Sequence, residues 1–214
     1  MLHLKAILLS TNDLKRWDEA IAILSRLYYS CDYHVKEPEV ITLLASNFKR
    51  KAMFDERGEL RDRYDEEVLK KAIDIYHDAY VFIDRDRWYN AINLAYLLLL
   101  QAKNHEEFEK AQEEIKKMYR ETGVCLNIDN SKELGENDVW RCIACVEFSL
   151  LMGDLFDAER YWKRCPSALS ADQRAVLKRQ MELFLHFFDE NISPKAKELK
   201  NGIEIFVENH LSKS

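Results

Sequence analysis

The residues of this chain that could hold a metal or undergo redox chemistry begin with Cys142 and Cys145, which form a CxxC pair. A structural zinc site needs a second pair of ligands, and the sequence has no companion CxxC or His pair. The surrounding run VWRCIACVEFSLL is typical of one continuous helix. We therefore interpret the two cysteines as small side chains packed against a neighbouring helix, with metal or redox chemistry as the alternative. We predict no metal and no cofactor.

The cysteines as a whole form an odd, irregularly spaced set in a chain large enough to fold without disulfides. Reduced thiols are therefore expected at every one of them. The set consists of Cys31, Cys125, Cys142, Cys145 and Cys165.

Two groups of acidic residues and histidines could also be drawn as sites. Asp74 and Asp78 lie at i and i+4 of a helical pattern with His77 between them, but His77 flanks the apolar stripe. We interpret this group as solvated surface. His105 is followed by glutamates without the HExxH spacing, at a helix start where acidic residues are expected. No nucleophile elbow, phosphate-binding glycine loop or dinucleotide fingerprint occurs, so we predict no enzyme.

The composition excludes other partners. The 32 Lys and Arg against 38 Asp and Glu are interspersed and give a net charge of -6, so the basic footprint of a nucleic-acid-binding protein is missing. We assign the aromatic residues to helix packing rather than to base stacking. The longest apolar run, AYLLLL, is far too short to cross a bilayer, and the N-terminus lacks a signal-peptide pattern. We expect a cytoplasmic protein with no nucleic-acid or membrane partner.

The same composition predicts helices almost throughout. Only 5 Gly and 3 Pro accompany 47% hydrophobic residues, so a turn-rich β architecture is disfavoured. The periodicity predicts about ten helices, and Gly153 and Gly123 fit an interhelix turn and a helix C-cap. Residues 55–65 are charged without an apolar stripe and are predicted to be a mobile loop, and residues 124–136 are irregular. The predicted helices cover residues 2–11, 14–30, 38–54, 65–82, 88–101, 106–123, a hairpin over 137–164, 170–189 and 193–210.

These helices carry a repeated pattern of alanine among large apolar residues. Ala20, Ala72 and Ala158 are each followed four residues later by a large side chain, which is typical of tetratricopeptide-like hairpins whose helices approach closely. The spacing between such alanines departs from a strict repeat of about 34 residues. The sequence therefore predicts an all-α fold, a short α-solenoid of degenerate tetratricopeptide-like helical hairpins, as one domain over residues 1–214.

Several motifs together resemble a known family. The segments ITLLASNFKRKAMFD, LKKAIDIYHDAYVFIDRDRWYNAINLAYLLLL and DVWRCIACVEFSLLMGDLFDAERYW, within residues 39–190, are similar to the tetratricopeptide-like MAP3K TRAFs-binding domain. That family includes bacterial stand-alone proteins and the central regulatory region of apoptosis signal-regulating kinases. The resemblance implies a regulatory protein-interaction role, and because the chain has no kinase motif it implies no phosphoryl transfer.

Repeat arrays of this kind use a concave groove to receive a peptide or partner protein. The helical spacing turns one set of polar residues toward such a groove, with a basic end at Lys49 and Arg50. Two asparagines at i and i+3 form its centre, where amides can hold an extended acidic or C-terminal peptide. The alternative is that Asn90 caps a helix and Asn93 is a buried amide. The predicted groove residues are Thr42, Ser46, Lys49, Arg50, Asn90, Asn93 and Glu147.

We therefore predict a non-enzymatic scaffold or regulatory module that binds a protein or peptide. The alternative function is a small-molecule or nucleotide-responsive regulator with a pocket inside the helical array. The C-terminal helix carries four large apolar residues that need covering, either by the rest of the chain or by a homodimer. These residues are Ile203, Ile205, Phe206 and Leu211.

Overall fold

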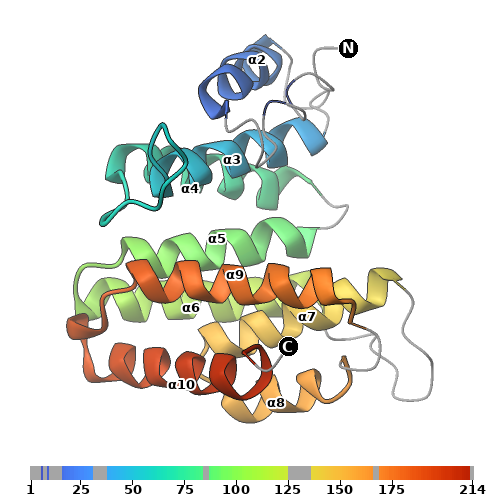
Figure 1. Cartoon of the computed structure of the whole chain (residues 1–214), viewed down its shortest axis with the longest axis vertical. Helices are drawn as coiled ribbons and strands as arrows, with labels where there is room; N and C mark the ends of the chain where they lie inside the picture. Colours follow the sequence, from blue (N-terminus) through green and yellow to red (C-terminus); the bar gives the residue numbers. More distant parts are fainter. Residues whose placement is uncertain are drawn as a thin grey trace. The chain divides into compact units, whose positions relative to one another are not determined.

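The structure is a computed structural model that describes residues 6, 9, 16–30, 38–83, 87–124, 136–165 and 169–212 (Figure 1). Over these residues it has nine α-helices, one 3-10 helix and no β-strand, which confirms the all-α, tetratricopeptide-like prediction. The predicted helix over residues 2–11 lies outside the described residues except for Ala6 and Leu9, as does most of the segment 124–136. The helices are α2 (Trp17–Ser30), α3 (Pro38–Met53), α4 (Glu66–Phe82), α5 (Arg87–Gln101), α6 (His105–Thr122), α7 (Glu136–Leu151), α8 (Leu155–Trp162), α9 (Ala171–Phe187), η2 (Glu190–Ile192) and α10 (Pro194–His210).

The chain divides into two compact units, Met1–Asn90 and Ala91–Ser214. Helices α2 to α4 belong to the first unit, α6 to α10 belong to the second, and α5 contains the boundary. The single domain over residues 1–214 stays a prediction. No helix among the described residues is long and apolar enough to span a bilayer.

In the first unit, α3 and α4 form a helical hairpin and α2 packs against α3. Ala20 of α2 and Ala72 of α4 have no exposed surface, and neither do Leu24 and Tyr76, which follow them by one helical turn. A residue larger than alanine at a fully buried position would push the helices apart. The predicted role of these alanines in close helix packing therefore agrees with their burial.

The segment between α3 and α4, predicted to be a mobile loop, contains a defined turn. The Asp55 carboxylate accepts hydrogen bonds from the backbone N–H groups of Arg57 and Glu59 at 2.9 and 2.8 Å. Gly58 has a φ of 74°, which an L residue rarely adopts, and an isolated β-bridge joins Phe54 to Leu60. Backbone hydrogen bonds to the Asp55 carboxylate also lower its pKa.

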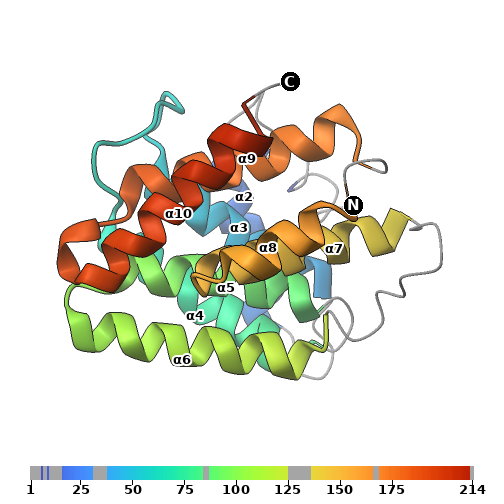
Figure 2. The same ribbon diagram turned by 90° about the horizontal axis from the view of Figure 1, so that it is seen from below.

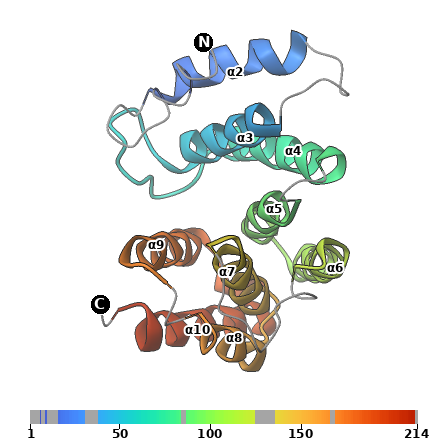
Figure 3. The same ribbon diagram turned by 90° about the vertical axis from the view of Figure 1, so that its right-hand side faces the viewer.

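In the second unit, α7 is the central helix. It contacts α6, α8 and α10, and every residue from 142 to 151 is buried. Figure 3 views several of these helices nearly end-on, with α7 between α6 and α9. Gly153, with a φ of 77°, forms the turn into α8, and Ala158 is completely buried five residues later, as predicted for this hairpin.

The last hairpin consists of α9 and α10 joined through η2, and the two helices lie side by side in Figures 1 and 2. Ile203 and Phe206 of α10 and its C-cap Leu211 are at most 2% exposed, whereas Ile205 is 54% exposed. The second unit therefore covers three of the four apolar residues for which the sequence left a homodimer open.

Helix α9 begins with a capping box at Ser170. The Ser170 hydroxyl accepts from the Gln173 backbone N–H at 3.2 Å, and the Gln173 side chain accepts from the Ser170 N–H at 2.9 Å. We expect Ser170→Ala to lower the free energy of unfolding by about 1 kcal/mol, measured from urea midpoints. Ser170→Asp is the control, because aspartate caps equally well. An unchanged midpoint for Ser170→Ala would contradict the assigned cap.

Candidate functional site

The residues predicted to line a groove divide between the two units. Thr42, Ser46, Lys49, Arg50 and Asn90 lie in the first unit, and Asn93 and Glu147 lie in the second. One groove made by all seven residues stays a prediction.

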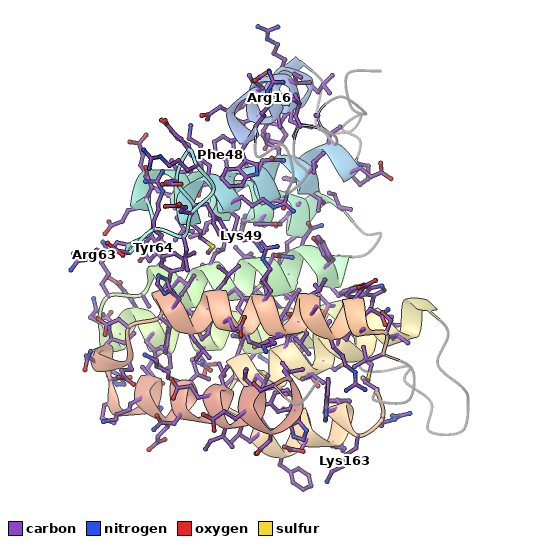
Figure 4. All side chains as sticks on the ribbon, viewed as in Figure 1. Arg16, Phe48, Lys49, Arg63, Tyr64 and Lys163 are labelled. Atoms are coloured by element: carbon purple, nitrogen blue, oxygen red, sulfur yellow. A yellow bond between two sulfur atoms is a disulfide. The ribbon has the colours of Figure 1, made fainter. Side chains whose placement is uncertain are left out.

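The α3 members of this set follow one row along the helix at half-buried positions. They are Thr42, Ser46, Lys49 and Arg50. Residues of the opposite face, including Ile41 and Leu44, are buried in the unit, at 3% and 0% exposure. Figure 4 shows Lys49 as a stick on α3. The row is thus partly accessible beside the core, as are Leu43, Phe48 and Lys51 of the same helix.

Asn90 of α5 is a buried residue that contacts this row and is not part of the surface. It is 2% exposed, and its Oδ1 accepts a hydrogen bond from the Thr42 hydroxyl at 3.0 Å. The amide nitrogen of Asn90 donates to none of the described residues. The oxygen of this amide is therefore occupied inside the protein, and only its N–H groups remain to be paired.

Tyr76 of α4 lies close to the same row. Its side chain is completely buried, and its hydroxyl has no hydrogen-bond partner of normal geometry among the described residues. Burial raises the pKa of Tyr76 well above its ordinary value, and the negative potential of Tyr89 adds to the rise. Nearby Ser46 and Arg50 act in the opposite direction. The phenol is therefore neutral at physiological pH and cannot serve as a base.

In the second unit, Glu147 is a buried carboxylate held by a tyrosine. It is 9% exposed, and its Oε1 accepts from the Tyr96 hydroxyl at 3.0 Å. Burial, followed by the charge and hydrogen bond of Glu147, raises the pKa of Tyr96 well above its ordinary value. Asn93 is 5% exposed. Both predicted residues of this unit are therefore interior groups that a ligand would reach only after local rearrangement.

The two groups of acidic residues and histidines that could be drawn as sites lie at the surface or are half-buried. Asp74 and His77 are exposed, and Asp78 is half-buried and accepts a hydrogen bond from the Tyr28 hydroxyl. His105 is exposed, with its Nδ1 4.0 Å from Glu109 Oε1. Within the described ranges, no group of three or more His, Cys, Asp or Glu side chains could hold a metal ion.

The prediction of reduced cysteines is wrong for Cys142, Cys145 and Cys165, the three cysteines that the structure describes, because each is disulfide-bonded. Cys142 in α7 and Cys165 after α8 form a disulfide across 23 residues. Both side chains are completely buried, as is Cys145. The hairpin turn at Gly153 folds the chain back, so residues far apart in sequence meet in the core. The irregular spacing of the cysteines gave no signal for this pairing.

Gln112 is a polar residue that sequence reasoning missed. It is 8% exposed, and its Nε2 donates to the Leu151 carbonyl oxygen at 2.7 Å. A signal was available, because Gln112 lies on the same α6 stripe as Phe108 and Ile115, which are both buried. A polar side chain on an apolar stripe has to find an internal partner.

The buried alanines, the glycine turn and the half-buried polar row define a tetratricopeptide-like helical-repeat protein. Residues 2–98, just under half of the chain, match the family model described as Tetratricopeptide Repeats-Sensor (TPR-S). No curated protein matches the chain, and no solved structure does. The finer resemblance to the MAP3K TRAFs-binding domain is not confirmed by this match and stays a prediction.

Proposed function

We propose that the chain is a non-enzymatic scaffold or regulatory module in the cytoplasm that binds a protein or peptide partner. The observation that carries the proposal is the half-buried row of Thr42, Ser46, Lys49 and Arg50 on α3. The match of the first unit to a tetratricopeptide family of sensors supports it, since arrays of this class present such helices to partners. Self-association through α10, where Ile205 is exposed, remains part of the proposal.

The proposed partner segment is acidic or ends in a free carboxylate. Lys49 and Arg50 supply two cationic groups at one end of the row, and arginine can hold a carboxylate through two parallel hydrogen bonds. The hydroxyl groups of Thr42 and Ser46 continue the row toward the N-terminus of α3. In this arrangement Asn90 positions Thr42, and its remaining N–H groups are available to a peptide carbonyl after a small movement.

The test is charge reversal of the basic end. We expect Lys49→Glu with Arg50→Glu to weaken binding of a partner captured from the native cell by about tenfold or more, because two attractions become repulsions. Dissociation constants measured by surface plasmon resonance check this. The matched control is Arg26→Glu with Lys70→Glu, which reverses two exposed charges elsewhere in the same unit.

The control variant should bind like the wild type, and circular dichroism should show that both double variants remain folded. Equal affinity of the Lys49→Glu, Arg50→Glu variant for the partner would remove this row as the binding surface.

A second candidate function, a small-molecule-responsive regulator, is favoured by a depression in the second unit.

A further inference from the structure

The second unit has a depression of about 310 Å³ between α6, the turn from α7 to α8, and α10. This volume lies at the lower end of the range of small-molecule sites, about 300–1,000 Å³, and equals that of about ten liquid water molecules. The depression belongs entirely to residues 91–214 and is separate from the α3 row.

The base of the depression consists of buried apolar side chains, and the apolar surface that a ligand can reach comes from half-buried Met152 and from Leu155, which is 37% exposed. The side chains of the base are at most 4% exposed and are those of Phe108 of α6, Leu150 of α7 and Leu199 of α10. Gly202 contributes no side chain, and a Cβ at this position would lie 3.2 Å from Leu155. Gly202 therefore lets α10 approach Leu155 closely, and the Leu155 side chain fills the space beside this glycine.

One polar group lies among these apolar residues. Gln112 lines the depression at 8% exposure, and donation from its Nε2 to the Leu151 carbonyl fixes which end of the amide is nitrogen. Its Oε1 accepts a hydrogen bond from none of the described residues. This oxygen is not one of the buried side-chain atoms that lack a partner, so it can be reached from the depression and can accept a hydrogen bond from a ligand.

The charges at the mouth also favour a donor. Lys195 Nζ is 2.9 and 3.0 Å from the two carboxylate oxygens of Glu109, and this hydrogen bond is the largest cause that lowers the Glu109 pKa. Lys116 Nζ is 2.9 Å from Glu113. Glu198, in contrast, has no ion pair or hydrogen bond with any described residue. Both lysines at the mouth are therefore neutralised by glutamates, and the uncompensated charge is negative.

We propose that this depression binds a small organic cation, an ammonium group on an apolar stem. The stem packs against Met152 and Leu155, and the ammonium donates hydrogen bonds to Gln112 Oε1 and the Glu198 carboxylate. The chemistry is shared by a free amine and by a lysine side chain of a partner. This inference rests on the second candidate function, since it names the ligand class of the same depression, and it concerns a different unit from the α3 row.

The test is an NMR titration of the full chain with 2-phenylethylammonium, using the backbone amides of Gly153 and Gly202 as reporters at the depression. Saturable shifts at these two amides are the expected result. The matched probe 3-phenylpropanoate has a similar apolar body with the opposite charge and should bind at least fivefold more weakly. Equal or tighter binding of the carboxylate, or no saturable shift with the amine, would overturn the proposal.

Substitutions at Glu198 and Gln112 test whether these two residues accept the hydrogen bonds of the ammonium group. Glu198 is exposed, so Glu198→Gln should keep the fold, and we expect it to weaken amine binding about fivefold. Gln112→Met, checked for folding by circular dichroism, should weaken it similarly. Glu208→Gln, at an exposed position of α10 outside the depression, is the control and should bind like the wild type. Wild-type affinity in Glu198→Gln would contradict the assigned ammonium contact.

A further titration distinguishes a free amine from a lysine side chain of a partner as the natural ligand. N-acetyl-lysine methylamide carries the lysine side chain without a free α-amine. Binding as tight as that of 2-phenylethylammonium would assign the depression to a lysine of a partner, and at least tenfold weaker binding would assign it to a free amine. Both results support the shared chemistry, and neither depends on Lys49 or Arg50.

Discussion

Phe184→Ala is expected to lower the free energy of unfolding of the second unit by about 3–5 kcal/mol, because it empties a large buried position. Phe184 is 1% exposed in α9. Its ring stacks on Phe188 at 4.7 Å between centroids and meets Tyr96 edge-on at 5.6 Å. Since Tyr96 also holds Glu147, the same ring supports the buried carboxylate. Urea unfolding followed by tryptophan fluorescence, with Trp162 as a reporter in this unit, measures the change.

The control lies on the same helix. Val176 is 54% exposed, so Val176→Ala removes apolar atoms without leaving a cavity and should cost less than about 0.5 kcal/mol. A loss for Phe184→Ala as small as that for Val176→Ala would mean that the aromatic cluster does not stabilise this unit.

Helix boundaries could be predicted from the sequence because the signals that set them are local. Asp65, Ser170 and Ser193 each accept from a backbone N–H three residues later, as an N-cap requires. Gly123 and Gly153 have positive φ at the ends where the sequence placed a C-cap and a turn. Each of these interactions spans only a few residues, so residue type and spacing are sufficient to find it.

The candidate site could be predicted only in part because its contacts join distant residues. The α3 row followed from helical spacing, and its half-buried placement agrees with that reading. The bond from Thr42 to Asn90 crosses 48 residues, and the one from Gln112 to Leu151 crosses 39. The spacing of residues on one helix predicts which of them share a face. Whether that face is buried depends on how the other helices pack against it. Asn90 and Asn93, predicted to form the centre of the groove, are both buried, at 2% and 5% exposure.

Replacing Cys142 and Cys165 by alanine is expected to lower the free energy of unfolding by about 3 kcal/mol in the absence of reductant. The disulfide closes a loop of 23 residues, and closing a loop of this length restricts the unfolded chain by about that amount. The loop contains the turn at Gly153 and all of α8, so the bond limits how far this hairpin can open. Urea unfolding of the wild type and the double variant, both without reductant, measures the difference.

The same comparison in the presence of reductant controls for the loss of two buried sulfurs, because the wild type then also lacks the bond between Cys142 and Cys165. Mass spectrometry of a non-reducing digest should recover a peptide pair that links Cys142 to Cys165, and the pair should disappear on reduction. If the double variant and the wild type unfold at the same urea concentration without reductant, the bond does not restrain the unfolded chain. The stability of the α7–α8 hairpin would then rest on packing alone, through Ala158 and Trp162, which are 0% and 5% exposed.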